Sequence, residues 1–130
     1  MIKPTFIAVL VFGLSGAALA NEDPCPNART QSELNACTAQ AYQTADKALN
    51  DVYRSYRANL GKESQAGLRK AQRAWIAFRD AECEFQASAV EGGSAQPMVR
   101  NGCLAALTRE RTEVLKAKTE CPEGDLACPR

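Results

Sequence analysis

The sequence predicts a small all-α domain of three helices, antiparallel in an up-down-up arrangement and stapled by disulfides. Three observations favour this fold. Apolar residues recur at helical spacing in three segments, helix-forming residues dominate, and the two-residue alternation typical of strands is missing. The connections between the segments are short, so consecutive helices are expected to be antiparallel neighbours.

The first 20 residues have the three parts of a secretory signal peptide. Lys3 supplies the positive charge, residues 6–14 the apolar run and residues 18–20 (Ala-Leu-Ala) the small-residue cleavage site. The apolar run is about half as long as a membrane-spanning helix, so it is not expected to remain as an anchor. A lipoprotein would carry Cys after the cut, where Asn21 stands. We therefore expect a cleaved, soluble chain that is periplasmic or secreted, with its helical domain over residues 21–118.

Composition excludes several functional classes. Lys3 is the only charged residue of the leader, so the mature chain keeps 15 basic and 15 acidic residues, and this balance argues against nonspecific nucleic-acid binding. The sequence has no histidine, which removes Ser-His and Cys-His catalysis. The carboxylates of Asp80, Glu84 and Glu91 are expected on the outer face of the second helix, where they make poor general acids. We expect no enzymatic activity and no cofactor.

Six cysteines in an exported chain predict three disulfides. Six cysteines allow about fifteen pairings, and the sequence alone does not choose among them. Metal binding is the rival interpretation, but the chain has neither a Cys-x-x-Cys motif nor a histidine, so no metal site is expected. Nearness along the chain favours the pairs Cys25–Cys37, Cys83–Cys103 and Cys121–Cys128.

The first helix is expected to begin at a capping box, with Thr30 as the N-cap and Glu33 three residues later. Gly61 is expected as the left-handed residue just past its end. The apolar face of this helix comprises Leu34, Cys37, Ala41, Ala45, Ala48, Leu49, Val52 and Tyr56.

The second helix is expected over about residues 65–90, where Gly92-Gly93 ends it, and the third from Pro97 to about Lys118. The predicted inner stripe of the second helix is Leu68, Ala71, Trp75, Phe78, Phe85 and Ala89. That of the third is Cys103, Leu104, Leu107, Val114 and Leu115. Residues 119–130 are expected to form an irregular tail with a local disulfide.

Polar residues interrupt the inner faces of the second and third helices. On a helical projection, four polar residues of the second helix lie within about 60° of the core residue Trp75, namely Gln72, Arg79, Glu82 and Gln86. In the third helix, Arg111 lies in the apolar stripe. One interpretation is an internal ion-pair cluster of Arg79, Glu82 and Arg111; the other is a polar binding site. We favour the cluster, because two arginines around one acid need no ligand.

Charge is segregated along the chain from the end of the first helix to the end of the second. From Arg54 to Arg79 there are seven basic residues against one acid, and from Asp80 to Glu91 four acids and no base. Exposed runs of like charge often serve only to keep one face of a protein hydrated. The alternative is that the acidic end and the turn after it meet a cationic protein, because opposite fields steer encounter. The candidate partner contacts are Asp80, Glu84, Glu91, Gly92, Gly93 and Ser94.

Several segments carry a family resemblance. They are Ala71-Gln72-Arg73-Ala74-Trp75, Phe78-Arg79-Asp80-Ala81-Glu82-Cys83, Glu91-Gly92-Gly93-Ser94 and Cys103-Leu104. Together they resemble the LprI-type, lysozyme-inhibitor-like domain of exported bacterial proteins, over about Cys25 to Leu115. The resemblance implies the helical fold and the two disulfides formed by Cys25, Cys37, Cys83 and Cys103.

The resemblance also implies a function. It suggests an exported protein that binds a cationic muramidase such as lysozyme and blocks its cleft. The alternatives are a non-inhibitory envelope module that binds another protein or the murein and aids stress tolerance, and a purely structural accessory domain. The chain departs from the family's founding lipoprotein in lacking the lipid-attachment Cys, so surface anchoring does not carry over, and the Cys121–Cys128 tail lies outside the family core.

Overall fold

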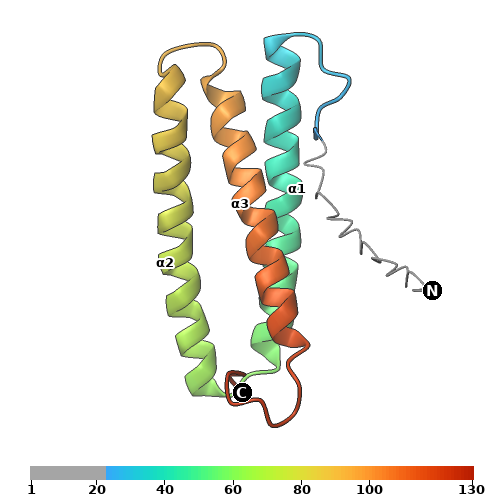
Figure 1. Cartoon of the computed structure of the whole chain (residues 1–130), viewed down its shortest axis with the longest axis vertical. Coiled ribbons are helices and arrows are strands. Elements are labelled where there is room, and N and C mark those ends of the chain that lie inside the picture. Colours follow the sequence, from blue (N-terminus) through green and yellow to red (C-terminus); the bar gives the residue numbers. More distant parts are fainter. Residues whose placement is uncertain (1–22) are drawn as a thin grey trace, which may run out of the picture.

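The computed structural model describes residues 23–130, which form three α-helices and no strand (Figure 1). The helices are α1 (Gln31–Ala58), α2 (Lys62–Ala87) and α3 (Gln96–Thr119), and a short 3₁₀ turn, η1 (Ser88–Val90), continues α2. They run down, up and down in Figure 1, which confirms the predicted up-down-up order. The expected signal peptide lies outside the described residues.

The start of α1 is the predicted capping box. The backbone N–H of Glu33 donates to Thr30 Oγ1 over 3.2 Å, and the Glu33 carboxylate accepts from the backbone N–H of Thr30 over 3.0 Å. The end of α1 differs from the prediction. Gly61 has an ordinary φ of −65° and is the N-cap of α2. The C-cap of α1 is Asn59, two residues before Gly61, so the connection needs no left-handed residue.

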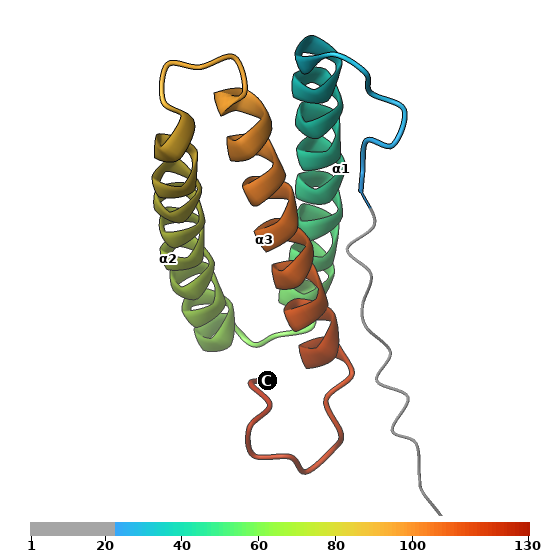
Figure 2. The same cartoon turned by 45° about the horizontal axis from the view of Figure 1, so that its top comes forward.

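α3 lies between the other two helices in both views (Figures 1 and 2). Its main interface is with α1, and α2 packs less extensively on its other side. The larger core cluster consists of Leu49, Tyr56, Leu60 and Leu115. A smaller cluster near the far end of the bundle contains Leu104 and the Cys83–Cys103 pair. Among residues 23–130, no helix is both long and apolar enough to cross a membrane.

The three expected disulfides are confirmed. Cys25–Cys37 straps the lead-in segment onto α1, with 5.9 Å between the Cα atoms. Cys83–Cys103 joins the end of α2 to the start of α3 over 5.4 Å. The third, Cys121–Cys128, closes a loop in the irregular tail.

The predicted inner stripe of α2 is wrong over much of its length. Phe78 is 56% exposed and Phe85 74%, and both Ala71 and Ala89 are exposed. The buried residues are instead Gln72, Arg79, Cys83 and Ala87. α2 is thus rotated by roughly a quarter turn, about 90°, from the predicted orientation. The Cys83–Cys103 bridge requires this rotation, because only the rotated helix turns Cys83 toward α3.

Smaller differences affect the other two helices. Ala48 of α1 and Val114 of α3 were expected inside and are exposed, Val114 by 46%. Thr108 and Thr112 of α3 are buried in their place, and the Thr112 hydroxyl donates to the Thr108 carbonyl over 3.0 Å. That bond satisfies the buried hydroxyl, so threonine can occupy an interior helix position.

Candidate functional site

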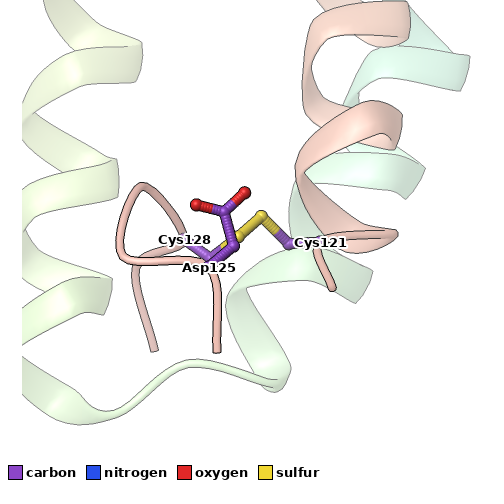
Figure 3. Close-up of side chains that lie close together, drawn as sticks. All are labelled: Cys121, Asp125 and Cys128. Atoms are coloured by element: carbon purple, nitrogen blue, oxygen red, sulfur yellow. A yellow bond between two sulfur atoms is a disulfide. The ribbon is translucent and has the colours of Figure 1, made fainter. Parts of the chain in front are cut away.

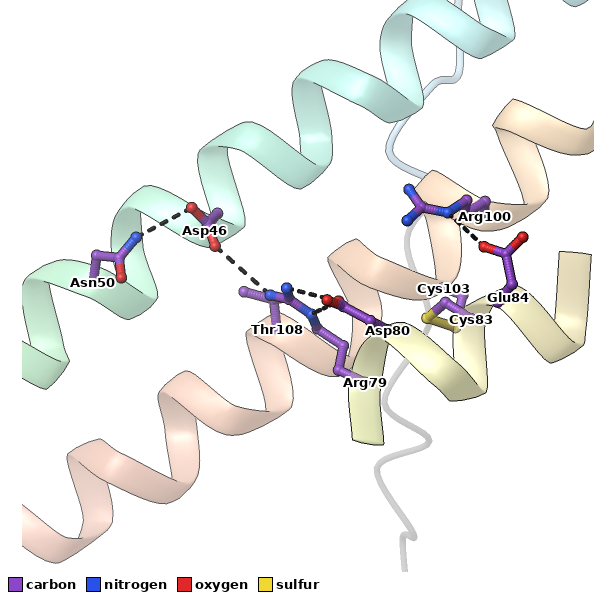
Figure 4. A network of polar contacts seen from close by, with 9 residues as sticks. All are labelled: Asp46, Asn50, Arg79, Asp80, Cys83, Glu84, Arg100, Cys103 and Thr108. Atoms are coloured by element: carbon purple, nitrogen blue, oxygen red, sulfur yellow. Dashed lines mark hydrogen bonds and ion pairs between the residues drawn. A yellow bond between two sulfur atoms is a disulfide. The ribbon is translucent and has the colours of Figure 1, made fainter. Parts of the chain in front are cut away.

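The polar seam between the helices centres on Arg79 (Figure 4). Its side chain is only 7% exposed. The guanidinium lies 5.4 Å from the ring centre of Tyr42 on α1 and 5.3 Å from that of Trp75 on α2. Both distances are within the range of cation–π attraction, which strengthens when the cation is desolvated.

Two carboxylates and a hydroxyl complete the surroundings of Arg79. Nε and Nη2 each lie 2.9 Å from Asp80 Oδ1, and Nη1 lies 3.7 Å from Asp46 Oδ1 of α1. Nη1 also donates to Thr108 Oγ1 of α3 over 3.3 Å. Arg79 therefore links all three helices through its charge and hydrogen bonds.

The ion-pair cluster expected among Arg79, Glu82 and Arg111 does not form. Glu82 accepts a hydrogen bond from Gln86 on its own helix, over 3.1 Å. The acids beside Arg79 are Asp46 and Asp80, because the packing of α1 brings Asp46 to the guanidinium. Asp46 was not among the expected site residues; on a helical projection it lies about 100° from Ala45, at the edge of the apolar α1 face.

Arg111 occupies a separate part of the seam. Its Nε donates to Gln72 Oε1 over 3.0 Å, and its guanidinium lies 5.7 Å from the Trp75 ring centre. Within residues 23–130, no carboxylate forms an ion pair with it. Partial burial lowers the pKa of Arg111 from its usual value, although the group stays protonated at neutral pH.

The candidate acids lie along the exposed side of α2 and in the turn that follows. Asp80 is about half-exposed and is paired with Arg79. Glu84 is more exposed, and its Oε2 accepts from Arg100 Nε of α3 over 3.1 Å (Figure 4). Glu91 is exposed, and within the described part of the chain it has no ion-pair partner.

The turn from Glu91 to Ser94 is held in place by α1 and α3. Gly92 has a φ of +73°, a conformation that favours glycine. Its N–H donates to Gln96 Oε1 over 3.0 Å, and the Ser94 carbonyl accepts from Asn35 Nδ2 of α1 over 2.9 Å. The turn is therefore joined to α1 near the segment that Cys25–Cys37 straps down, at one end of the bundle.

Two further features lie at the opposite end. The ligand atoms of Cys121, Asp125 and Cys128 are close together (Figure 3). Both sulfurs are bonded to each other, so they are not available as the thiolates that metal binding needs. The second feature is a cavity of about 380 Å³ between the start of α2 and the ends of α1 and α3, lined mainly by apolar side chains together with Arg111 and Lys118. The sequence gave no indication of this cavity.

Comparison with known proteins yields one family and one close relative. The profile of the family described as Lysozyme inhibitor LprI matches residues 23–115, which include the seam, the acidic residues and the turn. An uncharacterized protein of Rhizobium meliloti (strain 1021) is 43% identical over 116 residues, covering 79% of this chain and 84% of the relative. No solved structure shows a significant match.

Proposed function

The chain belongs to the LprI lysozyme-inhibitor family, and on that premise we propose that it is an exported protein that binds a cationic muramidase and blocks its cleft. The observation that carries the proposal is the extent of the family match, which runs from residue 23 to 115 and covers the helical bundle except the last four residues of α3. Three disulfides support action in the periplasm or outside the cell, because they persist in oxidising compartments.

The proposed contact surface is the acidic end of α2 with its turn. It comprises Asp80, Glu84, Glu91, Gly92, Gly93 and Ser94. The bonds from Asn35 and Gln96 hold the turn in one conformation before any partner arrives, which lowers the entropy lost on binding. Negative charge on this end would speed encounter with a basic enzyme and favour its correct orientation.

We propose that the protein acts by binding alone, without catalysis. The sequence contains no histidine, and all six cysteines are in disulfides. Asp80 and Glu84 are each paired with an arginine on the exposed side of the bundle. Surface carboxylates of this kind suit the electrostatic attraction of a cationic partner.

A second candidate function is non-inhibitory binding of another envelope protein or of murein. One observation favours it: the internal pairs Asp80–Arg79 and Glu84–Arg100 already neutralise part of the acidic surface. Glu91 is then the main free charge for a cationic partner, and the contact does not require a strongly basic enzyme. Pull-down from periplasmic extract and from insoluble murein distinguishes this function from the first.

The inhibitor proposal is tested with the purified mature chain, residues 21–130. We expect micromolar protein to inhibit at least one of the c-type, g-type and i-type lysozymes or a lytic transglycosylase, with weaker inhibition at high salt. Glu91→Lys should raise the inhibition constant by about three- to tenfold. Glu123→Lys, the same charge change in the tail at the other end of the bundle, is the matched control and should have little effect.

Full activity of all these enzymes in the presence of the protein would refute the inhibitor proposal. Equal loss of inhibition in Glu91→Lys and Glu123→Lys would place the contact elsewhere, since the two variants change net charge equally. Retention on murein without inhibition would support the second function.

A further inference from the structure

An apolar stripe on α2 is left uncovered by the bundle. It consists of Ala71, Ala74, Phe78, Ala81 and Phe85, all exposed, with spacings of three and four residues that place them on one face. This is the pattern of the a and d positions in a coiled coil. Phe78 and Phe85 are among the most exposed large apolar side chains of residues 23–130.

We propose that this stripe is the interface of an antiparallel homodimer, in which α2 pairs with α2 of a second copy about a two-fold axis near Ala77. This proposal does not depend on the inhibitor function. A two-fold axis uses the same patch on both copies, so the patch must complement itself when one helix is reversed. Both the size and the charge of the side chains on α2 meet this condition.

The sizes are complementary only in the antiparallel orientation. The N-terminal half of the stripe carries the small residues Ala71 and Ala74, and the C-terminal half carries Phe85. In the antiparallel register that pairs Lys70 with Glu84, the core layers set Phe78 of one copy against Ala74 of the other and Phe85 against Gly67. Gly67 is exposed and borders the cavity beside α2, which leaves room for the ring. Parallel pairing would instead place Phe85 against Phe85 and Ala71 against Ala71.

The charges favour the same orientation. Lys70 and Glu84 flank the stripe on the same side, seven residues before and after Ala77, at coiled-coil g positions. Antiparallel pairing brings Lys70 of each copy opposite Glu84 of the other, which gives two attractive pairs. Parallel pairing would set Lys70 beside Trp75 of the other copy and Glu84 beside Ala89, so neither ion pair would form.

Both side chains are available for this contact. Lys70 is exposed and, over residues 23–130, forms no ion pair within its own chain. Glu84 is 65% exposed, so its pairing with Arg100 leaves one side of the carboxylate open. The four phenyl rings, two from each copy, would supply most of the buried apolar area, because Phe78 is 56% exposed and Phe85 74% exposed in the monomer. The ion pairs would set the orientation and register.

The test is sedimentation equilibrium of the mature chain at about 1 µM to 1 mM, without any muramidase. We expect a dimer whose dissociation constant rises about tenfold in Lys70→Glu and in Glu84→Lys, because each change creates two repulsive pairs. The double variant Lys70→Glu/Glu84→Lys reverses both charges and should return to within about threefold of the wild type. Phe85→Ser should weaken the dimer about tenfold or more.

Arg69→Glu is the matched control for Lys70→Glu. It makes the same change in net charge one residue away, on the side of α2 opposite the stripe, and should leave the dissociation constant nearly unchanged. Circular dichroism melting of every variant checks that the fold is retained, and these exposed positions should tolerate the changes. A monomeric wild type at 1 mM (about the highest concentration in the series) overturns the proposal. So does a dimer that the double variant fails to restore, or that Arg69→Glu weakens as much as Lys70→Glu does.

Discussion

Arg79 is the residue at which the three helices converge. Burying a guanidinium costs several kcal/mol, about the size of a domain's whole stability, unless its charge and donors are matched. Asp80, Asp46 and Thr108 supply the match, and the rings of Tyr42 and Trp75 lie within cation–π range of the group. Arginine suits this position because its planar group can bond at its edge and stack on its faces together, whereas lysine carries a point charge.

Replacing Arg79 should be costly. We expect Arg79→Lys to lower the free energy of unfolding by about 1–2 kcal/mol, through loss of the stacking and of the forked pairing. Arg79→Met should cost about 2–4 kcal/mol, because Asp46 and Asp80 are then left near each other without a cation. Urea denaturation measures both changes. Arg73→Met, on the exposed side of the same helix, is the control and should change stability by no more than about 0.5 kcal/mol.

At the scale of a helix, the start of α1 depends on the charge of one side chain. Glu33 accepts hydrogen bonds from the backbone N–H groups of Arg29 and Thr30, and these bonds lower its pKa below the ordinary value of 4.5. A group whose pKa is lower in the folded state stabilises the fold above its unfolded pKa. That stabilisation disappears as the pH falls through the folded pKa.

We therefore expect a pH-dependent effect of Glu33→Gln. Near pH 7 the variant should be less stable than the wild type, because a neutral amide accepts the two backbone hydrogen bonds more weakly. As the pH drops below about 4.5, the wild-type carboxylate becomes protonated and the two proteins should converge in stability. Denaturant unfolding of both proteins from about pH 7 to pH 3 measures this. A stability difference that stays constant over the whole range would contradict the ionised capping box.

α2 shows at the same scale why helical periodicity alone does not fix which face is buried. Its residues offer two candidate faces about a third of a turn apart, one with Phe78 and Phe85 and one with Arg79 and Cys83. The disulfide to Cys103 and the contacts of Arg79 select the second face. The aromatic face is left for an intermolecular contact, such as the proposed dimer.

For the whole molecule, the three helices are not equally supported. α1 and α3 share the main interface, whereas α2 is fastened to the bundle near its C-terminal end, by Cys83–Cys103 and Arg79. The start of α2 instead borders the cavity of about 380 Å³. Local stability should therefore decrease along α2 from its disulfide toward Lys62, because stability follows the density of packed contacts.

Native-state hydrogen exchange should show this gradient. We expect backbone amides of residues 66–74 to exchange at least about tenfold faster than those of residues 100–112 in α3, because the first half of α2 is less buried, with Gln72 its one buried residue. Amides of residues 79–86, next to the disulfide, should be intermediate. Mass spectrometry of the oxidised mature chain measures all three segments. Equal protection along α2 would contradict the gradient.

The sequence by itself determined the local features of this protein. Three amphipathic segments with helix formers predict the three helices, and Thr30 with Glu33 predicts the start of the first, because capping depends on residues only three apart. The short connections predict the up-down-up order. Nearness along the chain favoured the three disulfides that the structure has, since each pair encloses a short loop. The candidate contact residues on α2 and its turn were inferred from the charge pattern of the sequence, and they remain a prediction.

Only the tertiary structure decided how these parts face one another. It set the rotation of α2, brought Asp46 of α1 to Arg79, and left Glu82 bonded within its own helix. It also opened the cavity beside α2 and exposed Phe78 and Phe85. The physical reason is that a helix with two partly apolar faces has no intrinsic preference between them. The choice follows from disulfide geometry and from ion pairs between distant residues, and neither is encoded in the periodicity of one segment.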